Sequence, residues 1–161
     1  MRAMASALAV TAGLLTWELG IEFAIVAVAF ARAEGVDLRY DIVGDGPERD
    51  RALYTAFDLG LEGVVCVIRP DRSVVGRLAE ADVFLWPDLT GRSSSAAREL
   101  AALGIDVVST VPATGVHFVP PRDPALMGSS LASVAGGHRR PAQRALGSHA
   151  VDAILEELGC E

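Results

Sequence analysis

The sequence predicts an α/β fold, a parallel sheet with helices on both faces, because short β-branched segments alternate along the chain with longer segments of helical length. Two of the short segments, residues 64–68 and 82–86, are almost continuously apolar. Such runs are typical of strands that are buried on both faces. Glycines follow several of the helical segments, where a left-handed residue commonly ends a helix. Together these observations predict a Rossmann-like sheet.

Six segments carry the strand pattern, being rich in β-branched or other apolar residues and bounded by turn residues. We expect strands at 7–12, 38–43, 64–68, 82–86, 106–109 and 116–119. The apolar start of the chain also resembles a secretory signal peptide. Because it runs into a glycine-containing turn at Gly13, we interpret it as the first strand.

Six other segments have helical length and boundary signals. We expect helices at 18–34, 48–59, 73–80, 94–103, after Pro124 and at 141–158. Gly35, Gly60 and Gly104 follow three of these helices, and Pro47 lies at the start of another. The sequence shows no internal repeat and no boundary between domains. We therefore expect residues 1–161 to form one domain.

The composition excludes several classes of function. Hydrophobic residues make up 51% of the 161 residues and charged residues 22%, which indicates a folded domain rather than a disordered segment. The formal net charge is −7, and all 14 basic residues are arginine because the chain contains no lysine. This absence excludes a P-loop lysine, a Schiff-base lysine and a Ser-Lys dyad. An acidic domain without a basic stripe is also not expected to bind nucleic acid.

Neither a metal site nor a membrane-spanning segment is expected. Cys66 and Cys160 are far apart and form no Cys-x-x-Cys pair, and the three histidines have no metal-ligand spacing. The apolar segment 21–31 carries Glu22 and is shorter than the ~20 residues that a bilayer requires. A cytoplasmic protein without a metal cofactor is therefore the expectation.

The loops that follow the predicted strands are the candidate ligand site, because ligands of open parallel sheets bind outside the carboxyl ends of the strands. The most informative of these loops is Gly44-Asp45-Gly46-Pro47. Its two glycines let the backbone turn tightly and approach a ligand, and its proline starts the next helix. A plain tight turn accounts for the same residues, so both interpretations stay open.

Several segments resemble, in order, the carboxy-terminal half of a GT-B glycosyltransferase. The resemblance is carried by residues 40–49, 59–61, 79–87, 99–108 and 119–124. The similar family is the retaining glycosyltransferase family 4, the group 1 type, which includes many bacterial polysaccharide and lipopolysaccharide sugar transferases. The resemblance extends over about residues 8–131 and implies one of the two Rossmann-like halves of that fold.

In that family this half binds a nucleotide-diphospho-sugar, so the resemblance implies a UDP- or GDP-sugar as donor, without a metal or other cofactor. Gly13, Gly44, Gly46 and Pro47 match loops that lie beside the nucleotide in the family. Glu99 matches a glutamate that accepts hydrogen bonds from the ribose hydroxyls, a role that suits an acceptor-only carboxylate. An ordinary solvated carboxylate near a helix start is the alternative for Glu99.

Three consecutive serines stand where the fourth helix is expected to begin. Ser94 and Ser95, with the free backbone N–H groups of a helix start, are candidates for holding the donor diphosphate. Arg92 lies close enough in sequence to add a guanidinium to that site. A simple helix cap is the alternative for the serines.

The chain departs from the family at the positions that carry charge. Leu14 and Leu19 stand where the family has an arginine and a lysine that clamp the diphosphate, and Gly91 stands where it has the first glutamate of its catalytic motif. Charged hydrogen bonds contribute about 1.5–3 kcal/mol each, so the loss of both cations weakens diphosphate binding. No catalytic residue of the family is intact, and between 111 and 115 the chain is shorter than the family pattern.

The resemblance therefore implies a donor-binding domain of the polysaccharide or glycoconjugate biosynthesis type, inactive without an acceptor-binding half. A separate amino-terminal half or a homo-oligomer is the partner that such a domain needs. The alternative is a non-catalytic, degenerate GT-B remnant that acts as an interaction or structural domain. The leucines at positions 14 and 19 favour that alternative, because an apolar loop suits packing against a partner.

Overall fold

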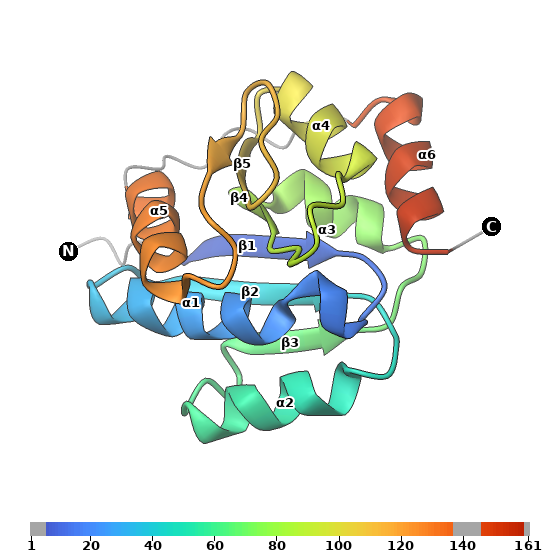
Figure 1. Ribbon diagram of the computed structural model, residues 1–161. Coiled ribbons are helices and arrows are strands. Elements are labelled where there is room, and N and C mark those ends of the chain that lie inside the picture. Colours follow the sequence, from blue (N-terminus) through green and yellow to red (C-terminus); the bar gives the residue numbers. More distant parts are fainter. Residues whose placement is uncertain (1–5, 137–145, 160–161) are drawn as a thin grey trace.

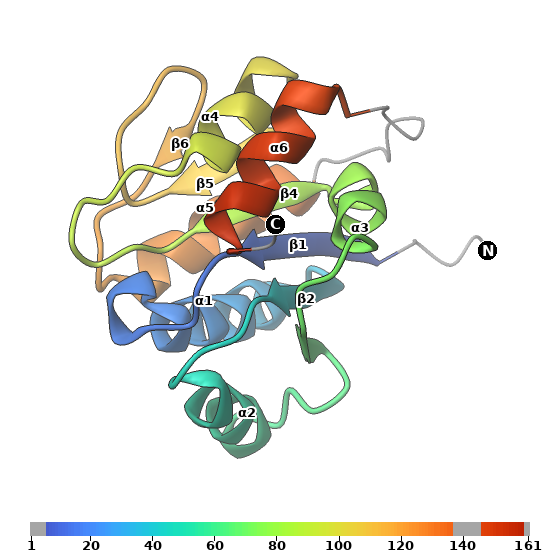
Figure 2. The same cartoon turned by 90° about the vertical axis from the view of Figure 1, so that its right-hand side faces the viewer.

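A computed structural model of the protein describes residues 6–136 and 146–159. In this part of the chain six parallel strands form one sheet in the order β3-β2-β1-β4-β5-β6. Helices α1, α2 and α5 cover one face of the sheet, and α3, α4 and α6 cover the other (Figures 1 and 2). The predicted Rossmann-like α/β fold is confirmed.

The strands lie where the apolar runs predict them. They are β1 (Ala7–Ala12), β2 (Leu38–Val43), β3 (Val65–Ile68), β4 (Val83–Trp86), β5 (Asp106–Ser109) and β6 (His117–Phe118). Strand order reverses at β1, which pairs with β2 on one side and β4 on the other. The carboxyl ends of β1, β2 and β4 are therefore neighbours, and the loops that follow them share one edge of the sheet.

Within the described residues the helices agree with the sequence in number and order, and only two of them begin more than one residue from the predicted start. They are α1 (Ile21–Ala33), α2 (Arg49–Asp58), α3 (Val74–Glu80), α4 (Ser95–Ala102), α5 (Pro124–Gly136) and α6 (Ser148–Glu157), preceded by a short 3-10 turn, η1 (Trp17–Leu19).

The start predicted for the first helix is wrong because Gly20 adopts a left-handed conformation, φ 70°, and separates η1 from α1. The start predicted for the last helix is wrong as well. Residues 146 and 147 are not helical, and Gly147 is the extended N-cap of α6. The first part of that predicted helix, residues 141–145, lies outside the described residues.

Helices α1 and α5 approach each other closely because the contact is made by small side chains. A Cβ atom on Gly128 of α5 would lie 2.6 Å from the Cβ of Phe30 and 2.7 Å from the carbonyl oxygen of Ala27, both on α1. The side of α1 that is buried carries several alanines. The backbones of α1 and α5 therefore lie almost in contact where the two helices cover this face of the sheet.

A pair of buried hydroxyls links the three central strands. The hydroxyl of Tyr40 on β2 lies 2.6 Å from Thr11 Oγ1 on β1, and Thr11 Oγ1 donates a hydrogen bond of 2.6 Å to the carbonyl oxygen of Leu85 on β4. Burial raises the pKa of Tyr40 well above its ordinary value. The phenol therefore stays protonated and donates to Thr11, so that both hydroxyl protons are used.

Because of this arrangement, removing one hydroxyl should cost more stability than removing the other. We expect Tyr40→Phe to lower the free energy of unfolding by about 0.5–1.5 kcal/mol, because Thr11 keeps its bond to Leu85. We expect Thr11→Val to cost more, about 1–3 kcal/mol, because it leaves the Tyr40 hydroxyl buried without a partner. Urea denaturation followed by circular dichroism measures both. Equal costs, or the reverse order, would contradict the proposed donor direction.

Candidate functional site

Two loops at the carboxyl edge touch through their backbones. A Cβ atom on Gly44, after β2, would lie 2.0 Å from the carbonyl oxygen of Gly13, after β1, and one on Gly46 would lie 2.4 Å from the carbonyl oxygen of Leu15. The Leu15 N–H also donates a 3.0 Å hydrogen bond to the carbonyl oxygen of Asp45. No side chain fits between these loops, so glycine is required at positions 44 and 46.

The structure brings together the four loop residues proposed for the nucleotide. Gly13 and Gly44 are buried where the loops meet, Gly46 is half-buried and Pro47 is exposed. The contact between the loops explains the two glycines at 44 and 46 by packing alone. The role of this surface beside a nucleotide stays a prediction.

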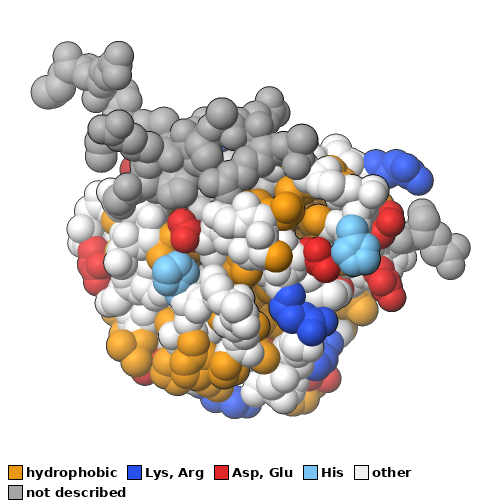
Figure 3. Space-filling model, turned by 90° about the horizontal axis from the view of Figure 1, so that it is seen from above, with side chains coloured by type: hydrophobic (Ala, Val, Ile, Leu, Met, Phe, Trp, Pro, Cys, Tyr) orange, Lys and Arg blue, Asp and Glu red, His pale blue; other side chains and the backbone are white. Residues whose placement is uncertain are grey.

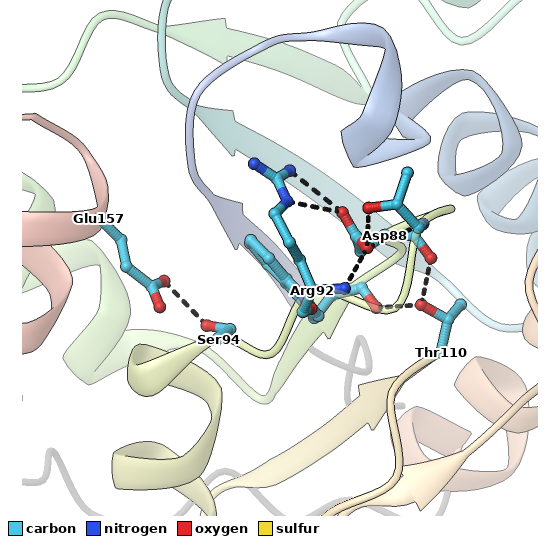
Figure 4. Close-up of polar contacts among 7 residues, drawn as sticks. Asp88, Arg92, Ser94, Thr110 and Glu157 are labelled. Carbon is cyan, nitrogen blue, oxygen red and sulfur yellow. Dashed lines mark hydrogen bonds and ion pairs between the residues drawn. The ribbon is translucent and has the colours of Figure 1, made fainter.

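The serines at the start of α4 are a helix cap and also hold an anion. Ser94 Oγ accepts a 2.9 Å hydrogen bond from the N–H of Ala97, which caps the helix. Ser94 Oγ donates to one carboxylate oxygen of Glu157 at 2.8 Å (Figure 4), and Ser95 Oγ donates to the other at 3.0 Å. The N–H of Ala96 donates to the same carboxylate at 3.2 Å. The anion at this helix start is thus the side chain of Glu157, which lies on α6.

Glu99 lies one turn further along α4 and is half-buried. Its carboxylate oxygen lies 3.5 Å from Nε2 of His149, another residue of α6. Helix α6 therefore contacts Ser94, Ser95 and Glu99, all three of the residues on or beside α4 that the sequence nominates for donor binding. The sequence assigns no role to Glu157 or His149.

The loop after β4 is ordered by a buried carboxylate that the sequence analysis did not identify. The Asp88 side chain is fully buried and accepts hydrogen bonds from Arg92 Nε at 3.1 Å and Nη2 at 3.0 Å. It also accepts from the N–H groups of Thr90 and Arg92, while Thr110 Oγ1 donates to the Asp88 carbonyl oxygen (Figure 4). The guanidinium of Arg92 is thus paired with Asp88. The sequence signal that points to this pair is the spacing of four residues between an acidic and a basic side chain.

Leu14, Leu19 and Gly91, the positions that the resemblance matches to charged groups, differ in their surroundings. Leu19 is fully buried in the core, whereas Leu14 is half exposed. The predicted apolar loop at both leucines is therefore wrong for Leu19, because η1 turns that side chain inward. Gly91 is exposed and left-handed, φ 82°, with open space around its Cβ position. A glutamate would fit there sterically, and its backbone would be strained.

One carboxylate at this edge is stabilised in its charged form by hydrogen bonds. Hydrogen bonds from the Thr16 side chain and the backbone lower the pKa of Glu18, a half-buried residue of η1. Within residues 6–136 and 146–159, no group of three or more His, Cys, Asp or Glu side chains is placed to hold a metal ion. No helix in this described part is long and apolar enough to cross a membrane. On the face that Figure 3 shows, acidic and basic side chains are interspersed and the described residues form no continuous basic stripe.

Sequence comparison finds glycosyltransferase relatives for part of the chain. No family model matches it. The chain is 38% identical over 105 residues to the putative colanic acid biosynthesis glycosyltransferase WcaL of Salmonella typhimurium, a match that covers 60% of this chain and 26% of the relative. The chain thus matches about a quarter of the length of the curated relatives it resembles.

Solved structures confirm the expected fold. Anabaena HepE in complex with UDP has a TM-score of 0.72 and 15% sequence identity, over 95% of this chain and 45% of HepE. WaaG, a glycosyltransferase involved in lipopolysaccharide biosynthesis, has a TM-score of 0.70 and 16% identity, over 97% of this chain and 43% of WaaG. The chain therefore has the Rossmann-like fold of one half of a GT-B glycosyltransferase, as the motifs imply.

The contact between the two glycine loops predicts a strong effect of a single methyl group. We expect Gly44→Ala to destabilise the protein by about 1–3 kcal/mol or more, because the added Cβ meets the Gly13 carbonyl oxygen and the loops must separate. Gly76→Ala is the matched control. It lies inside α3 with no atom within 4 Å of its Cβ position, and we expect a gain of about 0.5–1 kcal/mol. Urea denaturation of both variants checks this, and a neutral Gly44→Ala would contradict the packing argument.

Proposed function

We propose that this chain is the donor-binding half of a glycosyltransferase of the polysaccharide or glycoconjugate biosynthesis type, and that its ligand is a nucleotide-diphospho-sugar with UDP or GDP. The observation that carries the proposal is the similarity to WcaL together with the convergence of the loops after β1 and β2 and the start of α4 at one edge of the sheet. The solved structure of HepE with UDP supports a nucleotide as ligand of this fold.

The roles proposed for individual residues follow from their positions. Ser95 and Glu99 are four residues apart on α4 and therefore share one face of the helix. Donors at the helix start suit the diphosphate, and the Glu99 carboxylate one turn away suits the two adjacent hydroxyls of the ribose. Gly13 and Gly44 hold the 44–47 turn against the loop after β1. We propose that the backbone of this turn lies beside the nucleotide.

We further propose that the chain does not transfer sugar by itself. Leu14, Leu19 and Gly91 supply no charge at the three family positions, and Asp88 engages the guanidinium of Arg92. At these positions no cation is available to balance the negative charge that develops on a leaving diphosphate. Activity requires an acceptor-binding partner, either a separate amino-terminal half or a second copy of the chain. A cytoplasmic location remains part of this proposal.

The same absent charges favour one alternative function, a degenerate domain that keeps the fold and serves in interaction or structure. The burial of Leu19 and the Asp88–Arg92 pair are consistent with an edge that needs no ligand to be ordered. Nucleotide binding separates the two functions, because the alternative requires none.

Binding at the proposed site has a direct test. Titration of UDP or GDP, followed by amide NMR shifts, is expected to show saturable changes at 44–46 and at the start of α4. Glu99→Gln should weaken binding about tenfold, because the amide replaces one of the two acceptor oxygens with a donor NH₂ group and removes the charge. Glu80→Gln is the control, because Glu80 is an exposed residue at the end of α3, and it should leave the Kd unchanged. The absence of any nucleotide binding, in the wild type and in the variants described below, would favour the structural alternative.

The proposed lack of activity is tested on the purified chain. Incubation with UDP- or GDP-sugars is expected to release no nucleotide above the rate of spontaneous hydrolysis, because the cations that stabilise the leaving diphosphate are absent. Measurement of free UDP or GDP over time checks this. Steady turnover by the isolated chain would show that an acceptor-binding half is not required.

A further inference from the structure

Helix α6 packs along α4 in the opposite direction, so that it covers the candidate site. The last helical residue of α6, Glu157, lies at the first turn of α4, and the second residue of α6, His149, lies beside Glu99 further along α4. Figure 2 shows the two helices side by side. Both contacts fall on residues to which the proposed function assigns the donor.

The carboxylate of Glu157 uses the hydrogen-bond donors that an incoming diphosphate would need. The Oγ atoms of Ser94 and Ser95 and the N–H of Ala96 each donate to it, at 2.8, 3.0 and 3.2 Å. These groups belong to the positively polarised end of α4. Two anions cannot share the same three donors, so the carboxylate and a phosphate group compete for them.

The placement of Glu157 is unfavourable within its own helix. It lies in the last turn of α6, next to Glu156, and that turn contains no basic residue. Carboxylates are disfavoured at the negative end of a helix, whereas they are favoured at the positive end of another. The partner that stabilises this carboxylate is therefore the start of α4.

The rest of α6 is held by apolar packing that does not need Glu157. Ala150, Ile154 and Leu158 recur every four residues, form one stripe and are all buried. The Glu157 side chain is only partly buried, so its carboxylate can leave the start of α4 by rotation about its side-chain bonds while this stripe stays packed.

We propose that α6 is an autoinhibitory segment in which the Glu157 carboxylate occupies the diphosphate position at the start of α4, so that donor binding requires its displacement. The proposal rests on the proposed function. Glu157 is a built-in competitor, whereas the contact of His149 with Glu99 covers the ribose end of the same face. Removing the charge of Glu157 therefore frees the site without removing any group that binds the donor.

The test compares the wild type with Glu157→Gln, which keeps the shape of the side chain and removes its charge. Inorganic pyrophosphate and UDP are titrated separately into each protein, and the amide shifts of residues 95–97 report occupancy of the α4 start. We expect the Kd of both ligands to fall at least tenfold in Glu157→Gln. Glu156→Gln, an exposed neighbour in the same turn, is the matched control and should behave as the wild type.

A second variant guards against a folding defect in the first. Glu157→Asp keeps the charge and withdraws it by one methylene, which lengthens the bonds to Ser94 and Ser95. We expect it to lower the Kd of pyrophosphate in the same direction as Glu157→Gln and by a smaller factor. Thermal unfolding of each variant shows that α6 remains docked.

The outcomes separate the inference from the proposed function. If pyrophosphate binds more tightly to Glu157→Gln and UDP does not bind, Glu157 competes with an anion at the start of α4 but the proposed donor function fails. If UDP binds the wild type and Glu157→Gln with equal affinity, the donor function stands and autoinhibition is overturned. Autoinhibition is also overturned if neither ligand shifts residues 95–97 in a folded Glu157→Gln protein.

Discussion

The close backbone contacts at the carboxyl edge of the sheet are the constraint on which the rest of the site depends. A Cβ atom on Gly44 would lie 2.0 Å from the Gly13 carbonyl oxygen, and one on Gly20 would lie 2.3 Å from the Pro87 carbonyl oxygen. These contacts join the loop after β1 to the loops after β2 and β4. They also set where η1 ends and α1 begins, because Gly20 is the left-handed residue between them.

The charges at this edge are neutralised by groups of the protein itself. Asp88 takes the guanidinium of Arg92, and Glu157 takes the donors at the start of α4. In a chain with a net charge of −7 and no lysine, these are two of the groups that would attract a phosphate. Both are paired with a carboxylate, and the two pairs differ in kind. The Asp88 side chain is fully buried and bonded within its own loop, whereas the Glu157 side chain is partly exposed and comes from another element.

The difference between the two pairs bears on the proposed need for an acceptor-binding partner. The chain matches about a quarter of the length of its curated relatives and covers less than half of HepE or WaaG. In the proposed function, the edge that carries Glu157 faces the acceptor-binding half. A carboxylate that can be displaced at this edge is consistent with a site that becomes available when the partner is present. A permanently buried pair such as Asp88 with Arg92 only orders the loop.

The sequence by itself determined the sheet, the order of its elements and the loops that gather at one edge. Apolar runs such as 82–86 specify strands locally, and the ordered GT-B motifs nominate Gly44 and Glu99 without any knowledge of contacts. Only the tertiary structure decided how that edge is occupied. Glu157 is 63 residues from Ser94, and nothing in the local pattern of α6 marks it as the partner of another helix. The burial of Leu19 was likewise decided by the fold, because the turn η1 points that side chain into the core. Periodicity and motifs report what a segment is, whereas the pairing of charges depends on which segments the fold brings into contact.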